Sequence, residues 1–123
     1  MLAAHRKIEL KMKTISMYRL INYAEKLPEH FSLDEKTKLS VFMSKKNKVF
    51  RQFCFIPEKF EGNQAGVIPL FAHIMVSSNT GHIKIDAFQP ELFNLNPVDI
   101  EKIKCSLILH IEKQINNTGI QDF

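Results

Sequence analysis

The sequence predicts an α+β fold: an antiparallel sheet of about four strands, arranged as two hairpins, with an N-terminal and a C-terminal helix packed on it. Hydrophobic residues recur every three or four positions near both ends of the chain, as in amphipathic helices. Between these segments they alternate with polar residues, as in half-buried strands. The chain has 123 residues, 45% of them hydrophobic, which suits one domain with its own core.

The first helix is predicted to begin after Thr14 or Ser16, because either hydroxyl is a suitable N-cap. It is predicted to end before Pro28, because a proline displaces the preceding residue from the α region. Its hydrophobic stripe consists of Met17, Leu20, Ile21, Ala24 and Leu27. Ser32 and Glu35 then have the spacing of a capping box, which predicts one further helical turn.

Two β-hairpins are predicted in the middle of the chain. In the first, residues 39–44 and 49–56 flank a turn of lysine and asparagine residues. In the second, residues 67–76 and 82–88 flank a short polar turn. Pro69 is expected near the start of its strand or on an edge, because proline cannot donate a ladder hydrogen bond.

The last helix carries the clearest local signals. Asn96 is a preferred N-cap residue, Pro97 is a preferred first helical residue, and Gly119 follows as a stop signal. Its apolar stripe consists of Ile100, Ile103, Leu107, Ile111 and Ile115. This helix is therefore predicted to cover a hydrophobic face of the sheet.

Residues 1–13 are predicted to be a flexible extension, and residues 14–123 a single α+β domain, since no linker or repeat divides them. The N-terminal residues lack the apolar core of a signal peptide, so we expect a cytoplasmic protein. The bias toward Phe, Ile, Lys and Asn is typical of AT-rich microbial genomes, so we expect a bacterial origin. No apolar run approaches the ~20 residues of a membrane span, so we expect no membrane partner.

Several kinds of chemistry lack their usual signals. Cys54 and Cys105 are far apart and have no Cys/His ligand spacing, so neither a metal site nor a redox motif is predicted. The four glycines form no phosphate-binding loop, and no paired carboxylates indicate magnesium or glycosidase chemistry. We therefore expect no cofactor, no metal and no catalytic residue, and the balance of signals is against an enzyme.

Basic residues are concentrated in the first half of the chain. Residues 1–60 hold 13 basic and 6 acidic side chains, whereas residues 61–123 hold 4 basic and 7 acidic. The densest cluster consists of Lys36, Lys38, Lys45, Lys46, Lys48 and Arg51. With Phe50, Phe53 and Phe55 close by, it would suit a surface that stacks bases and holds phosphates. In the other interpretation, these phenylalanines fill the core and the lysines prevent pairing at a strand edge.

His73 and Asp86 are a candidate catalytic pair. If Asn79 and Thr80 form a two-residue turn, the hairpin register places His73 opposite Asp86. The carboxylate would then orient the imidazole as a general base. A small enzyme that uses this pair is one functional hypothesis, and a polar pair on the sheet surface is the other interpretation.

Residues 89–97 connect the second hairpin to the last helix and include Leu92 and Phe93. Exposed apolar side chains in a connector would mark a protein interface. In the other interpretation, they staple the connector to the core before the helix begins.

The first functional hypothesis is a non-enzymatic cytoplasmic protein that binds another protein. Within this class we expect an immunity protein that neutralises a toxin, or an antitoxin- or chaperone-like protein, as a monomer or homodimer. The residues expected to bind the partner are Lys45, Lys46, Lys48, Arg51, Leu92 and Phe93. The alternative hypothesis is a nucleic-acid-binding module that uses the basic hairpin from Lys45 to Arg51, and the third is the small enzyme.

Overall fold

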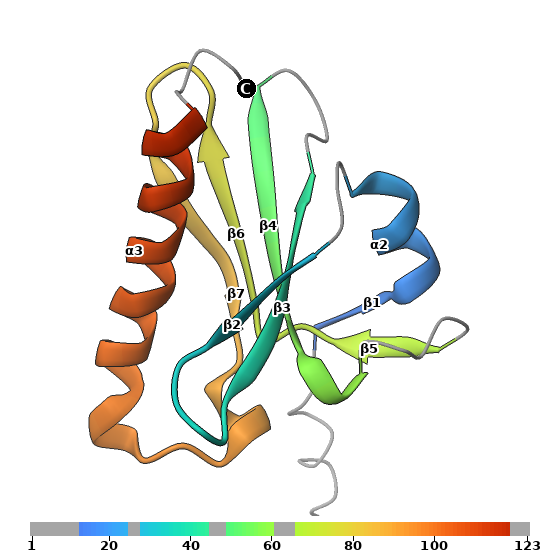
Figure 1. The fold of residues 1–123 in the computed structure, drawn as a ribbon, viewed down its shortest axis with the longest axis vertical. Helices are drawn as coiled ribbons and strands as arrows, with labels where there is room; N and C mark the ends of the chain where they lie inside the picture. The colour runs from blue at the N-terminus through green and yellow to red at the C-terminus, as the bar shows by residue number, and fades with distance from the viewer. Residues whose placement is uncertain (1–12, 25–27, 45–48, 61–65, 119–123) are drawn as a thin grey trace, which may run out of the picture.

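The computed structural model describes residues 13–24, 28–44, 49–60 and 66–118. They form an α+β structure with a five-stranded antiparallel sheet at its centre (Figure 1). A long helix lies along one face of this sheet, and a smaller layer lies on the other face. A hydrophobic cluster fills the space on each side of the sheet.

The five-stranded sheet has the order β2-β3-β4-β6-β7, and every neighbouring pair is antiparallel. Its strands are β2 (Glu29–Ser32), β3 (Lys38–Ser44), β4 (Phe50–Pro57), β6 (Ala72–Ser77) and β7 (Ile83–Phe88). The smaller layer consists of β1 (Thr14–Ser16), α2 (Met17–Tyr23) and β5 (Val67–Pro69). The remaining elements are the 3-10 helices η1 (Glu58–Phe60), η2 (Pro90–Phe93) and η3 (Pro97–Asp99), and the long helix α3 (Ile100–Thr118).

The predicted α+β class is confirmed, but the strand count is corrected. The main sheet has five strands instead of four, and β1 and β5 form a separate two-stranded sheet. The capping box predicted at Ser32 and Glu35 does not start a helical turn. Instead, a carboxylate oxygen of Asp34 accepts hydrogen bonds from the backbone N–H groups of Lys36 and Thr37, each at 2.8 Å. This Asx-type turn joins the additional edge strand β2 to β3.

The first helix begins as predicted but is shorter. Ser16 is its N-cap, and its hydroxyl accepts a hydrogen bond from the backbone N–H of Arg19 at 3.0 Å. The helix ends at Tyr23, because Ala24 has an extended backbone conformation. Leu27 of the predicted stripe lies outside the described residues.

The predicted strand over residues 67–76 is two strands that belong to different sheets. β5 pairs with β1, whereas β6 pairs with β4 and β7. The chain changes sheets at Leu70 and Phe71, directly after Pro69. Pro69 is the last residue of β5, not near the start of a strand, but β5 is an edge strand of the two-stranded sheet, so the expected edge position is confirmed.

Gln89 joins the two sheets at this break. Its buried side-chain amide both accepts and donates hydrogen bonds with backbone groups, as the backbone of a neighbouring strand does. The Oε1 atom accepts a hydrogen bond from the N–H of Lys13 at 2.9 Å, and the Nε2 group donates to the carbonyls of Lys13 and Leu70. The backbone N–H of Gln89 donates to the carbonyl of Phe71 at 2.8 Å. Gln89, which directly follows β7, therefore fixes the position of Lys13, which directly precedes β1.

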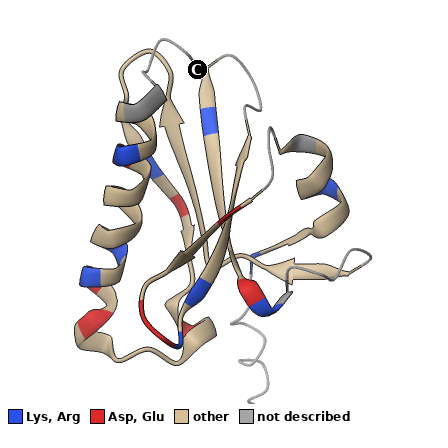
Figure 2. Ribbon diagram, viewed as in Figure 1, with Lys and Arg blue, Asp and Glu red and all other residues tan. Residues whose placement is uncertain are grey.

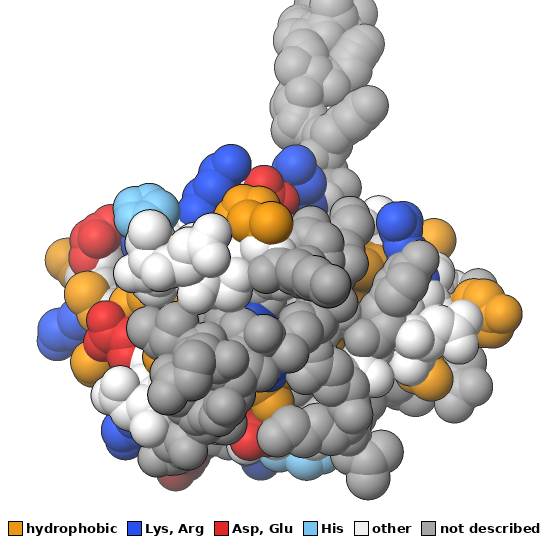
Figure 3. Space-filling view, turned by 90° about the horizontal axis from the view of Figure 1, so that it is seen from above, with side chains coloured by type: hydrophobic (Ala, Val, Ile, Leu, Met, Phe, Trp, Pro, Cys, Tyr) orange, Lys and Arg blue, Asp and Glu red, His pale blue; other side chains and the backbone are white. Residues whose placement is uncertain are grey.

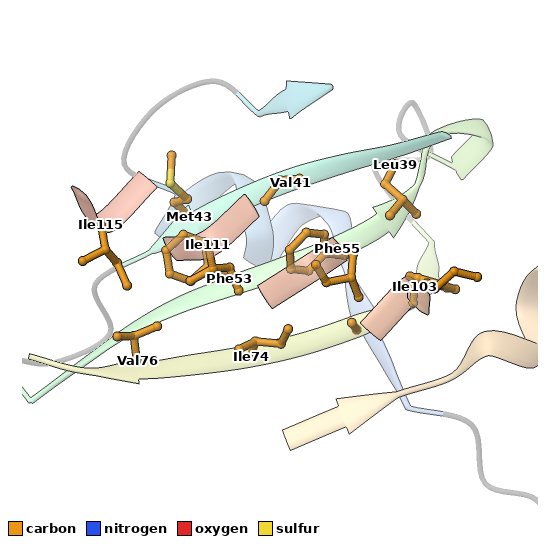
Figure 4. Packing of buried hydrophobic residues seen from close by; sticks show 13 residues of the cluster. Leu39, Val41, Met43, Phe53, Phe55, Ile74, Val76, Ile103, Ile111 and Ile115 are labelled. Carbon is orange, nitrogen blue, oxygen red and sulfur yellow. The ribbon is translucent and has the colours of Figure 1, made fainter. Parts of the chain in front are cut away.

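The larger hydrophobic cluster lies between α3 and the sheet (Figure 4). The buried residues of the predicted stripe on α3 are Ile103, Leu107, Ile111 and Ile115. They face alternate residues of β3, β4 and β6, which are Leu39, Val41, Met43, Phe53, Phe55, Ile74 and Val76. The predicted N-cap is also confirmed, because Asn96 Oδ1 accepts a hydrogen bond from Val98 N–H at 3.2 Å, where η3 leads into α3.

The smaller cluster lies on the opposite face of the sheet. Met17 and Leu20 of α2 pack there with Phe42, Cys54, Ile56, Ile68 and Leu70. A sheet covered on both faces has apolar residues on both sides of its central strands. However, α2 has only seven residues, so it covers part of the face, and a pocket lies beside it.

Candidate ligand pocket

A pocket with a volume of about 260 Å³ lies between the smaller layer and the five-stranded sheet. Its apolar lining residues are Ile15, Leu20, Ala24, Phe42, Cys54 and Leu70. Its polar and charged lining residues are Lys13, Thr14, Arg19, Ser44, Gln52, His73 and Asp86. Small-molecule sites commonly combine an apolar wall with a few polar groups that orient the ligand.

Four of these polar residues form a line across the sheet, which we call the polar row: Ser44, Gln52, His73 and Asp86. They come from four successive strands, β3, β4, β6 and β7. Ser44 pairs with Gln52 across β3 and β4. Gln52 Oε1 lies 2.8 Å from His73 Nε2, and His73 Nδ1 lies 3.0 Å from Asp86 Oδ2. Because all four residues stand on paired strands, the sheet fixes their spacing.

A β-bulge lies in β7 where Asp86 meets His73. Ile74 pairs with Ile85, whereas His73 pairs with Ala87, so β7 has one extra residue at this point. Such an insertion allows two consecutive side chains to oppose one residue of the neighbouring strand. The register predicted for a two-residue turn, with His73 directly opposite Asp86, is therefore wrong by one residue at this point, but the two side chains are in contact through a hydrogen bond.

Both ring nitrogens of His73 face acceptor oxygens, one from Asp86 and one from Gln52. Nδ1 can donate to the Asp86 carboxylate, and Nε2 pairs with the side-chain amide of Gln52, which holds both a donor and an acceptor. The hydrogen bond from His73 is the largest influence that lowers the pKa of Asp86, and the charges of Lys13 and Lys84 lower it further. Asp86 is therefore an ionised carboxylate at neutral pH, already engaged by His73.

Ser44 provides an unused polar group in the row. Its side chain is 9% exposed and lines the pocket, and Oγ has no hydrogen-bond partner within the described part of the chain. A buried hydroxyl without a partner costs roughly 1–3 kcal/mol of stability. Ser40, on the same strand and face, also has a buried Oγ without a partner there, but it does not line the pocket. The two serines therefore differ in their access to a ligand.

Cys54 lies next to His73 in the pocket, since the two residues pair across β4 and β6. Burial raises the pKa of the Cys54 thiol to about 12. The thiolate is the nucleophilic form of cysteine, so Cys54 is not an activated nucleophile at neutral pH. In residues 13–24, 28–44, 49–60 and 66–118, no group of three His, Cys, Asp or Glu side chains is arranged to hold a metal.

The residues predicted to bind a partner lie in different surroundings. Lys45, Lys46 and Lys48 lie outside the described residues. Arg51 is only 8% exposed and stands on the face of β4 that carries Phe53, because side chains alternate along a strand. It is therefore buried beside the larger cluster and does not extend an open basic surface.

Leu92 and Phe93 form part of η2 and are half-buried against the larger cluster. The ring of Phe93 lies 5.2 Å from that of Phe71 in an edge-to-face arrangement. These contacts favour the interpretation that the two residues staple the connector to the core. The described Lys and Arg residues are spread over the sheet and both helices, among Asp and Glu residues (Figure 2).

Ser44 and Gln52 were not among the predicted site residues. Both occur at alternating strand positions, in step with Phe42 and Cys54. The sequence predicts helices that cover one face of the sheet. Polar residues on the uncovered face then have the same pattern as ordinary exposed surface residues. The signal that would have identified them is the presence of large apolar residues at the same spacing on both faces.

No protein-family model, curated protein or solved structure matches this chain. No helix in the described ranges combines the length and apolar character needed to cross a membrane. The geometry itself defines the class: an α+β protein in which a partial layer on one face of an antiparallel sheet encloses a pocket above a polar row.

Proposed function

We propose that this protein binds a small molecule in the pocket above the polar row. The observation that carries the proposal is the hydroxyl of Ser44, which is buried at the pocket wall beside Gln52 and has no partner in the part of the chain that the structure describes. Buried polar groups in folded proteins nearly always have a partner, so an orphan group in a pocket is a natural contact for a ligand. The apolar residues of the smaller layer would cover the rest of that ligand.

Binding is favoured over catalysis by the contacts of His73. A general base needs a ring nitrogen that faces the reacting group. Here Nδ1 is engaged by Asp86 and Nε2 by Gln52, and the neighbouring Cys54 is not an activated thiol. The hypothesis of a small enzyme that uses His73 and Asp86 therefore requires Gln52 to move away from Nε2 when a substrate enters.

Ligand-observed NMR with a fragment set of small acids, amides, amines and alcohols would test the proposal. The test variant is Ser44→Ala, and Ser40→Ala is the matched control, because both serines are buried and unpartnered on one face of β3. We expect fragments that bind the native protein and the S40A variant but bind S44A at least about tenfold more weakly. No binding fragment, or equal weakening in both variants, would refute the proposal.

A protein partner remains a second candidate, as an immunity, antitoxin-like or chaperone-like protein would require. The observation that favours it is the exposure of Tyr18 and Ile21, which lie three residues apart on one face of α2. Viewed from above, isolated hydrophobic side chains lie at the edge of the molecule where α2 and β5 stand (Figure 3). Affinity capture with the native protein and a Y18E/I21E variant would test it, and a partner retained equally by both would contradict this surface.

A further inference from the structure

We propose that the ligand is a compact amphipathic carboxylic acid, bound with its carboxylate at the polar row and its apolar body against the smaller layer. This inference rests on the proposed function, because it names the chemical class that the same pocket would take.

The formal charge of the pocket lining favours an anion. Lys13 and Arg19 carry positive charges at its wall, and Asp86 carries the one negative charge among its lining residues. That carboxylate already accepts a hydrogen bond from His73 and lies in the field of Lys13 and Lys84. The lining therefore holds two formal positive charges against one negative charge, a balance that favours an anion over a cation.

The unused hydrogen-bonding capacity also matches a carboxylate. Within the described residues Ser44 Oγ has no partner, so its hydroxyl can donate to a ligand oxygen. A hydrogen bond to an ionised acceptor is stronger than one between neutral groups, so a carboxylate gains more from this donor than an amide or alcohol does. Thr14 provides a second hydroxyl in the lining, at the side formed by β1.

The volume and apolar lining limit the body of the ligand. About 260 Å³ is below the range of roughly 300–1,000 Å³ that is typical of drug-sized sites, so the ligand is compact. Leu20, Phe42 and Leu70 come from α2, β3 and the break between the sheets, and they form an apolar wall. Such a wall suits a short aliphatic chain or one aromatic ring.

Isothermal titration calorimetry with two matched ligand series would test this inference on the full chain. Benzoate would be compared with benzamide and benzylamine, and hexanoate with hexanamide and hexylamine. We expect at least one acid to bind about tenfold or more tightly than its amide, with the amine weakest. The K13Q and R19Q variants should each weaken the acid by about twofold to fivefold, whereas K102Q, on the exposed side of α3, should not.

The outcomes separate this inference from the proposed function. If the amides bind as tightly as the acids and S44A weakens both, the pocket binds ligands but the carboxylate inference is wrong. If an amine binds most tightly, or if neither acid binds while other fragments do, the inference is overturned and the proposed function stands. If neither these compounds nor the fragment set binds in a manner that depends on Ser44, the proposed function fails as well.

Discussion

Truncation of Leu107 to alanine should reveal how strongly α3 holds the sheet. Leu107 is fully buried in the larger cluster, near the middle of α3. Loss of most of this side chain removes roughly 2 kcal/mol of burial free energy, at ~0.8 kcal/mol per methylene. The cavity left in a close-packed core raises the expected loss to about 3–4 kcal/mol. A single domain has about 5–15 kcal/mol in total, so the variant should still fold but be much less stable.

The assay is equilibrium unfolding in urea, followed by far-ultraviolet circular dichroism. Leu109→Ala is the matched control, because Leu109 lies two positions along the same helix and is 58% exposed. It should change the free energy of unfolding by about 0.5 kcal/mol or less. The dependence of the unfolding free energy on urea should stay the same in both variants, since the same surface is exposed.

Two results would refute the packing described for α3. One is a loss of less than about 1 kcal/mol in L107A, which would mean that the site is not a close-packed core position. The other is an equal loss in L109A, which would mean that a different face of the helix is buried.

Three further predictions concern titration, thiol reactivity and a turn. Burial lowers the pKa of His110 below its usual value of 6.5, although Glu29 opposes this shift. The unfolded chain therefore takes up a proton first, and the free energy of unfolding should fall as the pH drops below about 6.5, in urea titrations that H110Q should flatten. A chromogenic disulfide reagent should modify the exposed Cys105 in the native protein at mildly alkaline pH and leave Cys54 unmodified until urea is added. Gly81 has a φ of 75°, so G81A should lower the melting temperature by destabilising the turn by about 1 kcal/mol.

The parts of the fold that were predictable are those with local signals. The N-cap at Asn96 and the apolar stripe of α3 both depend on residues close in sequence, and both are confirmed. The alternation in the first hairpin likewise placed Phe53 and Phe55 on one face. The second hairpin has the predicted register between Ile74 and the turn, but the predicted two-residue turn is wrong, because Ser77 N–H donates to the carbonyl of His82 and residues 78–81 form the loop.

The parts that were not predictable depend on distant partners. β1 and β5 have three residues each and pair across about fifty positions of sequence, so neither has enough residues for a pattern of its own. The residues between β2 and β3 fit two local patterns, a capping box and an Asx-type turn. The Asx-type turn of Asp34 is the one that forms. The pocket combines residues of β1, α2 and four strands of the main sheet, and such a combination exists only after the chain has folded.

The way Gln89 joins the two sheets has an evolutionary consequence. Among the described residues, its side-chain amide forms hydrogen bonds to backbone atoms of Lys13 and Leu70, so the side chains at those two positions take no part in these bonds. We expect related chains to retain glutamine at 89, whereas positions 13 and 70 are constrained by their place in the pocket lining and not by this contact. Glutamate has nearly the same shape, but it would place a carboxylate oxygen against two carbonyl oxygens where the amide now donates. A single-nucleotide change between the two codons would therefore weaken the contact between the layers that enclose the pocket, so selection for an intact pocket would act at a residue outside its lining.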